Sequence, residues 1–378
     1  MAQELGARVM AQIEFSEEQN MLLDTAGEFC KTHASIELVR AGIEGDQSVN
    51  SEVWKKMADL GWMGIIVPEE YGGLGLGLSD VVPIVESMGR NLMGSPYTSN
   101  VLATQALVSS ADASQKAFWL PRIVEGEVAT IALTEVDGSW KLEEIESSAA
   151  LIEDRIELSG VKCFVQDLNA ANILIVSAIL EGEARLLVLD KSVIPESNYE
   201  REVVIDETRR SFRLNLEGVS VSKTNLLPKA DFKALEAAAL LMLCAEISGG
   251  LMGLLPVIVE YLNTRKAFDR LIGSYQALKH PTVDILMSLE AARSHLYHAS
   301  TLFAQEKIDD FESAIRMAKA HGSEAFAFAG DRAVQFHGGF GFTYECDAQL
   351  FLRRALWCQY QFGDEKYHRQ LLAKTLFD

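Results

Sequence analysis

The feature that most constrains the fold is a block of short β-rich runs set between two helical blocks. Before about residue 125, apolar residues recur at three- and four-residue spacing, the period of amphipathic helices. After Lys229 that period returns. The runs between them are rich in β-branched and large aliphatic residues, and they cover 129–134, 173–176, 185–189 and 212–216. This order predicts an α+β protein with domains at 1–125, 126–230 and 231–378.

The helices expected after the β block are long and unusually apolar. They cover 235–261, 281–305, 313–334 and 350–376. Such helices are too apolar to stand alone on a surface, so we expect them to pack as a bundle and to offer a face to another subunit.

Charge and cysteine usage exclude some function classes. The 378-residue chain carries a formal net charge of -20, which disfavours a nucleic-acid partner because phosphate contacts need a basic patch. Its five cysteines are scattered, with no paired metal-type spacing. They are typical of reduced thiols in a cytoplasmic protein, and we expect neither a metal site nor disulfides.

Two segments bear on targeting. Residues 1–8 lack the basic start and apolar run of a secretory signal. Residues 237–259 are long enough to span a bilayer, but they contain Glu246, which costs roughly 2.5–3.5 kcal/mol at a membrane centre. We therefore expect a buried core helix and no membrane span.

Two segments near the C-terminal end carry groups suited to an anion or a ring edge. The later one, Gln335-Phe336-His337-Gly338-Gly339-Phe340-Gly341-Phe342, places an amide before closely spaced glycines, where backbone can approach a ligand. The earlier one runs from Arg265 through Phe268 to Gln276 and His280.

In these segments the chain resembles the acyl-CoA dehydrogenase family, which carries Arg-x-x-Phe-Gly, Gln-x-x-x-His and Gln-x-x-Gly-Gly-x-Gly-Phe stretches in the same order. Phe15-Ser16-Glu17-Glu18-Gln19 resembles the family's opening helix, and the segment 60–75 resembles its loop before the substrate cavity. The resemblance covers nearly the whole chain.

The resemblance implies a fold, a cofactor and a reaction. The fold is a helical N-terminal domain, a β-barrel-like middle domain and a C-terminal four-helix bundle that mediates oligomerisation. FAD would lie extended between the middle sheet and the bundle, with part of its pocket supplied by a neighbouring subunit. The reaction is α,β-dehydrogenation of an acyl-CoA thioester, with electrons passed to an electron-transfer flavoprotein.

The resemblance also assigns flavin contacts in the β block. Leu133 and Thr134 would meet the pyrimidine edge of the flavin, and Ser139 would meet a phosphate. Phe164 would pack on the ring, with Gln166 near its edge. The Thr-Glu loop that carries Leu133 to Ser139 lacks the family's proline and final aspartate and is one residue shorter.

The rest of the expected cofactor site comes from the last block. Arg265 offers a planar fork of donors that suits a diphosphate. The further residues that the resemblance implies are Phe268, Gln276, Gln335, Gly338 and Gly339. Asp269 stands where most relatives have glycine, and an acid beside Arg265 would form an ion pair with it or repel the ligand.

The catalytic base is not at either position that the family pattern indicates. Removing the α-proton needs a carboxylate, but Phe362-Gly363 replaces the family's Glu-Gly pair, and Ala239 occupies the position used by the isovaleryl-type branch. Glu246, on nearly the same helix face as Ala239 and about 10.5 Å further along the axis, is the remaining candidate. Its alternative role is a structural ion pair with an arginine such as Arg332 or Arg353.

Other bases and other functions stay open at this stage. Glu345 and His337 are weaker candidates for the base. Because both family carboxylates are missing, the chain is alternatively a non-catalytic subunit of a heteromeric dehydrogenase, like bacterial relatives that degrade steroid side chains or other bulky acids. A related flavin oxidase is a third possibility. The acyl chain is not predicted.

Overall fold

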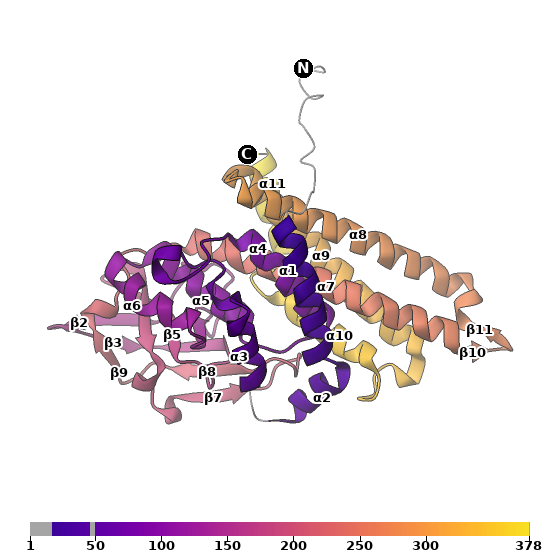
Figure 1. The fold of residues 1–378 in the computed structure, drawn as a ribbon, viewed down its shortest axis with the longest axis horizontal. Helices are drawn as coiled ribbons and strands as arrows, with labels where there is room; N and C mark the ends of the chain where they lie inside the picture. Colours follow the sequence, from indigo (N-terminus) through magenta and orange to yellow (C-terminus); the bar gives the residue numbers. More distant parts are fainter. Residues whose placement is uncertain (1–16, 46–49, 378) are drawn as a thin grey trace, which may run out of the picture.

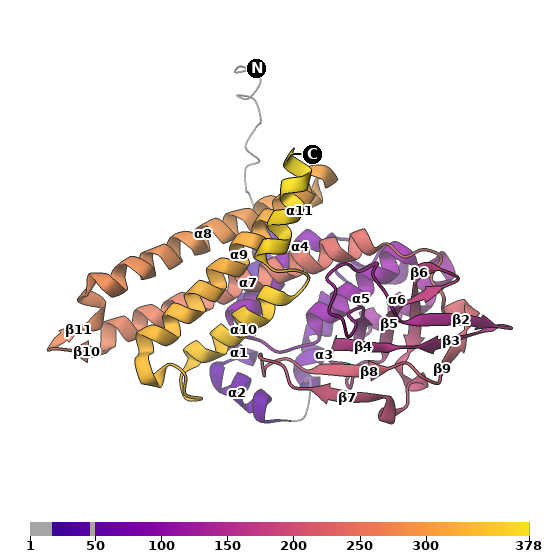
Figure 2. The same ribbon diagram turned by 180° about the vertical axis from the view of Figure 1, so that it is seen from behind.

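The computed structural model describes residues 17–45 and 50–377, so the predictions for residues 1–8 and for Phe15 and Ser16 lie outside the described part. Two sheets with their covering helices form one half of the molecule, and a long helical bundle forms the other (Figure 1). The reverse view shows the same arrangement (Figure 2). The predicted α+β fold class is confirmed, with helical N- and C-terminal parts around a central β part.

The N-terminal part is helical. Its α-helices are α1 (Glu17–His33), α2 (Ile36–Glu44), α3 (Ser51–Asp59), α4 (Leu78–Arg90), α5 (Tyr97–Ser110) and α6 (Ala113–Val124). Side chains of Ser35, Asn50 and Asp112 accept hydrogen bonds at the starts of α2, α3 and α6, which fixes where these helices begin.

The middle part contains two sheets. The strands are β1 (Ala129–Ala132), β2 (Ser148–Ile152), β3 (Arg155–Ser159), β4 (Val161–Gln166), β5 (Ile173–Leu180), β6 (Glu183–Asp190), β7 (Tyr199–Glu202), β8 (Ser211–Asn215) and β9 (Val219–Ser222). One sheet has the order β1-β5-β2-β3-β9, with β6 paired to β5, and the other has the order β4-β8-β7. The four predicted runs correspond to β1, β5, β6 and β8.

The C-terminal part is a helical bundle. It contains α7 (Phe232–Thr264), α8 (Gln276–Ala304), α9 (Ile308–His337), α10 (Asp347–Tyr360) and α11 (Glu365–Phe377), with a small hairpin of β10 (Lys266–Ala267) and β11 (Arg270–Leu271) after α7. The single helix expected over 350–376 was wrong, because the chain breaks between α10 and α11. Gly363 has φ +105° there, which no α-helix contains.

The chain passes from the last N-terminal helix to the first strand between Val124 and Ala129, and from the last strand of the β part to α7 between Ser222 and Phe232. We propose domain boundaries within these connections, at 125/126 and 230/231.

Helix α7 organises the core. By length and composition it is the one described helix that could cross a membrane, but 67% of its most apolar window is buried inside the molecule. It packs on α4 closely enough that a Cβ on Gly249 would lie 1.9 Å from the carbonyl oxygen of Glu86, so only glycine fits at this crossing. Helix α7 is therefore a buried core helix, as expected from its sequence, and α4 is one of the helices that cover it.

Candidate functional site

The pocket between the β part and the bundle contains most of the residues expected around a flavin ring. Its walls come from α5, β1, β4, α7 and the segment after α10, and its volume is about 70 Å³. Leu133, Thr134, Phe164, Gln166 and Glu246 all line it. We call this the ring pocket.

A strained turn in β4 presents Phe164 to the ring pocket. The pairing of β4 with β8 shifts register between Lys162 and Val165, and Phe164 has φ +56°. Such a bulge re-aims side chains, and positive φ at a phenylalanine costs energy that the surrounding structure must hold. Phe164 remains 45% exposed, so its ring is available for contact.

Gln166 brings an unsatisfied acceptor to the same wall. Its Nε2 donates to the carbonyl oxygen of Phe164 at 3.1 Å, whereas its buried Oε1 has no hydrogen-bond partner among the described residues. A buried polar atom without a partner is unfavourable unless a ligand satisfies it. Gln166 therefore fits a ligand that carries an N–H group.

A buried ion pair anchors Glu135 of the Thr-Glu loop. Lys162 Nζ lies 2.5 Å from Glu135 Oε1, and both side chains are almost fully buried. Glu135 also accepts a hydrogen bond from the backbone N–H of Ser147 at 2.9 Å. Ser139, the expected phosphate contact, is not part of the ring pocket and instead donates to Glu144 at 2.6 Å.

One face of α7 forms the opposite wall of the ring pocket. Ala239, Leu243 and Glu246 are spaced as neighbours on a helix face, and all three line the pocket. Phe362, in the break after α10, lines it as well. Both positions at which the resemblance implies a catalytic glutamate therefore face the pocket with apolar side chains.

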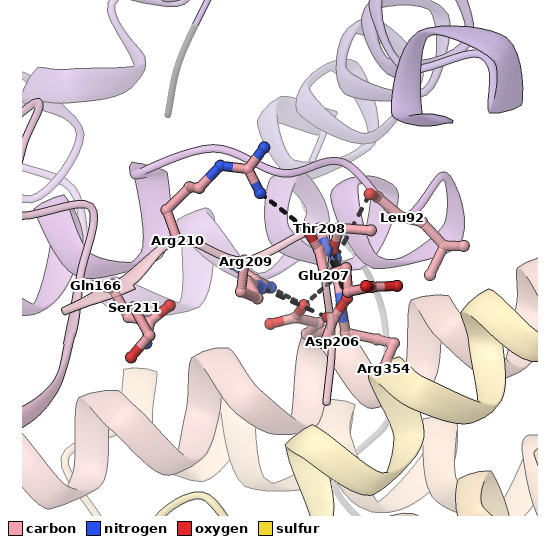
Figure 3. A network of polar contacts seen from close by, with 10 residues as sticks. Leu92, Gln166, Asp206, Glu207, Thr208, Arg209, Arg210, Ser211 and Arg354 are labelled. Atoms are coloured by element: carbon pink, nitrogen blue, oxygen red, sulfur yellow. Dashed lines mark hydrogen bonds and ion pairs between the residues drawn. The ribbon is translucent and has the colours of Figure 1, made fainter. Parts of the chain in front are cut away.

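Glu246 is held by two arginines. Its Oε1 accepts hydrogen bonds from Arg209, on the loop before β8, and from Arg354, on α10. Arg354 also donates to Asp206 and to Thr208, and it is fully buried (Figure 3). The partners expected from sequence, Arg332 and Arg353, were wrong, because they pair with Asp331 and Glu207 instead.

Asp167 adds a second carboxylate to the ring pocket. It follows Gln166 directly, has φ +52° and is 5% exposed. Burial raises the pKa of Asp167 to about 7, against the opposing influence of Arg209 and Arg210. This carboxyl group therefore changes charge near neutral pH.

A second crevice of about 530 Å³ contains the other expected cofactor residues. Arg265, at the end of α7, lines it together with His337, Gly338 and Gly339. Nineteen residues of helix separate Glu246 from Arg265, or about 28 Å at 1.5 Å per residue. Both ribbon views place the adjacent hairpin β10–β11 at the end of the bundle away from the sheets. The ring pocket and the Arg265 crevice are thus two separate sites within one subunit.

The hairpin beside this crevice carries Phe268 and Asp269 at its tip. Both have positive φ, +54° and +60°, as a two-residue hairpin turn of the tightest type requires. Phe268 is 91% exposed. Gln276 and Gln335 are also exposed and are not among the residues that line the crevice.

The two weaker candidates for the base lie away from the ring pocket. His337 is stacked on Tyr261 at 4.0 Å between ring centroids, in the Arg265 crevice. Glu345 is exposed on the segment before α10 and does not line the ring pocket. Across the described ranges, no three metal-ligating side chains are grouped as a metal site.

Two models of one protein family match the chain, one in its N-terminal part and one in its C-terminal part. The N-terminal domain of acyl-CoA dehydrogenase matches residues 16–127, and the C-terminal domain matches residues 237–377. The chain belongs to the acyl-CoA dehydrogenase family. Family members are FAD-binding flavoproteins and oxidoreductases, which confirms the cofactor and the enzyme class expected from sequence.

Similar proteins within the acyl-CoA dehydrogenase family align along almost the full chain. Acryloyl-CoA reductase (NADH) of Anaerotignum propionicum is 28% identical over 385 residues, covering 97% of both chains. Acyl-CoA dehydrogenase IpdE2 of Mycolicibacterium smegmatis is 28% identical over 342 residues, covering 90% of this chain and 93% of the relative. A chain from the structural study of the electron transferring flavoprotein of Acidaminococcus fermentans is 26% identical, with a TM-score of 0.85 over 97% and 99% of the two chains.

Several residues of this acyl-CoA dehydrogenase site were not expected from sequence. Asp167, Arg209 and Trp357 line the ring pocket, and Asp206 and Arg354 lie behind it. Asp167 directly follows the predicted Gln166, so its position was available from the sequence. The other visible signal was the run Asp206-Glu207-Thr208-Arg209-Arg210 before a strand, which brings two acids and two arginines together.

Proposed function

We propose that this chain binds FAD in the ring pocket and supports α,β-dehydrogenation of an acyl-CoA thioester there. The convergence of Phe164 and Gln166 with the Glu246 face of α7 on one pocket carries this proposal. FAD, when bound, would accept the β-hydride. Phe164 would pack on its ring, Gln166 Oε1 would accept a hydrogen bond at its edge, and Leu133 and Thr134 would line its pyrimidine side.

We propose Glu246 as the group that takes the α-proton. Ala239 and Phe362 supply no carboxylate, so Glu246 is the glutamate on that wall. Its two arginine partners favour the ionised carboxylate, which is the form that accepts a proton.

The proposed FAD-dependent reaction is tested by anaerobic titration of the purified yellow protein with acyl-CoA thioesters. Bleaching of the flavin absorbance supports the proposal, and a protein that stays colourless with added FAD contradicts it.

The second crevice supports a cofactor shared between subunits. Arg265 would hold the diphosphate of an FAD whose ring lies in a neighbouring subunit, with Gly338 and Gly339 approaching the same cofactor. The exposed Phe268, Gln276 and Gln335 would then contact that neighbour or its cofactor. Ser139 would reach a phosphate only after release from Glu144. The assembly is accordingly a dimer or larger, with either identical or different chains.

We further propose a cytoplasmic enzyme that passes electrons to an electron-transfer flavoprotein. All five cysteines are free and buried, which supports a reducing compartment. The similar chain from the Acidaminococcus fermentans study supports the choice of electron acceptor.

A non-catalytic subunit of a heteromeric dehydrogenase is the second candidate. The specific observation in its favour is that Ala239 and Phe362 face the ring pocket while Glu246 is occupied by two arginines. Such a subunit would complete the cofactor site of a different chain through its Arg265 crevice. Purification from the native host discriminates the two candidates, because a homo-oligomer that turns over acyl-CoA unaided excludes the partner role.

A further inference from the structure

The ring pocket contains buried charge that a hydrocarbon chain would not need. Arg209 is 8% exposed, Glu246 is 2% exposed, and Arg354 and Asp206 behind them are at most 1% exposed. Replacing such buried ion pairs by apolar residues is often neutral or stabilising. A charged wall in an acyl pocket therefore suggests that it recognises something polar.

Two buried donors on this wall are left without partners. Arg209 Nε has no hydrogen bond within the described chain, and its nearest carboxylate oxygen, on Asp206, is 4.0 Å away. Trp357 Nε1 is buried and equally unpaired, and Trp357 lines the same pocket. The Arg209 guanidinium carbon lies 4.9 Å from the centre of the Trp357 ring, so the two side chains are stacked. Each residue therefore has one N–H group for which the described chain supplies no acceptor.

The start of α5 adds a third favourable group. Thr98 and Ser99, in its first turn, line the ring pocket. Ser95 Oγ accepts one hydrogen bond of this turn, from the backbone N–H of Tyr97 at 3.4 Å. The positive end of the helix dipole lies at the wall of the ring pocket and favours an anion there.

The charge balance tolerates an added negative charge only when Asp167 is protonated. Arg209 and Arg354 face Asp206, Glu246 and Asp167, whereas Arg210 donates to the backbone carbonyl oxygens of Gly42 and Gly45 and does not line the pocket. Burial raises the pKa of Asp167 to about 7, and its protonation leaves two cations facing two anions. An entering carboxylate then meets no net negative charge.

Resting on the proposed function, we propose that the acyl chain accepted here ends in a carboxylate and that Arg209 binds it. The substrate class is the monothioester of a short dicarboxylic acid. The carboxylate would accept hydrogen bonds from Arg209 Nε and Trp357 Nε1. Because Arg209 contacts Glu246 directly, the terminal carboxylate and the α-carbon must lie close together, which favours a short chain.

The test compares two five-carbon thioesters, glutaryl-CoA and valeryl-CoA, on the purified holoenzyme with any partner chain that co-purifies. Binding is measured by calorimetry and by perturbation of the flavin spectrum. We expect glutaryl-CoA to bind at least ten-fold more tightly. Equal binding, tighter binding of valeryl-CoA, or binding of neither thioester overturns this inference, whereas the proposed function is contradicted only by a protein that stays colourless with added FAD.

Two variants connect the preference to the named donors. Trp357→Phe keeps the ring under Arg209 but removes the N–H, and we expect it to reduce the preference for glutaryl-CoA several-fold. Arg209→Met should abolish the preference, and Arg185→Met, which removes an exposed arginine on β6 paired with Glu183, should preserve it. An undiminished preference in Trp357→Phe, which is expected to fold normally, would overturn the assignment even if Arg209→Met is unstable.

Discussion

Ala239 and Glu246 lie two turns apart on the same face of α7 and line the same pocket, but only the second carries a carboxylate. The carboxylate is also tied to the arginines of two other segments. Catalysis by this chain therefore depends on whether the carboxylate of Glu246 can remove the α-proton. The resemblance to the isovaleryl-type branch places that carboxylate at the position of Ala239.

Replacing Glu246 by glutamine should lower acyl-CoA-dependent flavin reduction by at least about 100-fold, the usual scale for loss of a general base. Stopped-flow absorbance under anaerobic conditions measures this rate. The visible spectrum should show that FAD remains bound.

The matched control for that variant is Asp206→Asn. It disturbs the same Arg354 but changes no group that lines the ring pocket. If Asp206→Asn slows the reaction as much as Glu246→Gln, the loss reflects the ion network and Glu246 is not the base.

Introducing glutamate at position 239 should raise the rate of flavin reduction at least ten-fold. The new carboxylate would stand at the position implied by the isovaleryl-type branch, on the pocket wall and without an arginine partner among the contacts of residue 239. Ala239→Gln, of nearly the same size, is the control. A gain in both variants would mean that pocket shape, and not proton transfer, limits the rate.

The stability of the protein should fall between pH 4 and pH 7 because of Asp167. Its pKa is raised from 3.8 to about 7 on folding, so over this range the folded state retains a proton that the unfolded state has lost. Asp167→Asn removes this penalty. We expect the variant to match the wild type near pH 4 and to exceed it by up to about 4 kcal/mol at pH 8.

Urea unfolding at several pH values measures this difference. Asp154→Asn, at an exposed position on the turn between β2 and β3, is the control and should show no pH-dependent gain. A constant difference between wild type and Asp167→Asn across the pH range would contradict the buried titration.

Replacing Asp269 by glycine should strengthen FAD binding several-fold. The change removes a negative charge four residues after Arg265 in the chain and relieves a residue with φ +60°. Asp269→Asn separates the two effects, because it removes the charge but keeps the side chain. Fluorescence titration of the apoprotein with FAD gives the affinities, and an unchanged affinity in both variants would show that Asp269 does not repel the cofactor.

A cofactor shared between identical subunits can be tested by complementation. Phe164→Ala and Arg265→Ala damage different half-sites, so each variant alone should lose FAD. When the two variants are co-expressed, random pairing makes about half of the dimers mixed, and each mixed dimer has one site with both halves intact. About a quarter of all sites should therefore regain FAD. Recovery of no FAD would indicate that each subunit binds its cofactor alone or that the partner is a different chain.

The sequence predicted the order of helical and β parts because periodicity is local, and the family resemblance pointed to Leu133, Thr134, Phe164 and Gln166, which line the ring pocket. Periodicity within a window identifies a helix, and a motif such as Phe164 to Gln166 is read within one strand. The apolar composition of residues 237–259 likewise predicted a buried helix, with Glu246 as its one charge.

The parts that could not be predicted depend on contacts between distant segments. Glu246 is 37 residues from Arg209 and 108 residues from Arg354, and no local pattern selects these partners over Arg332 or Arg353. The break after α10 was missed because the apolar period continues through Phe362, while Gly363 adopts a backbone angle that a pattern of apolar residues does not report.

The length of α7 has a practical consequence. Along this rigid helix the ring pocket, near its middle, and the Arg265 crevice, at its C-terminal end, stay about 28 Å apart, so under the proposal one subunit does not bind both ends of one FAD. Under the shared-cofactor arrangement proposed above, diluting the enzyme below the dissociation constant of its subunits would release FAD into solution. An assay run at nanomolar enzyme would then report assembly as much as chemistry.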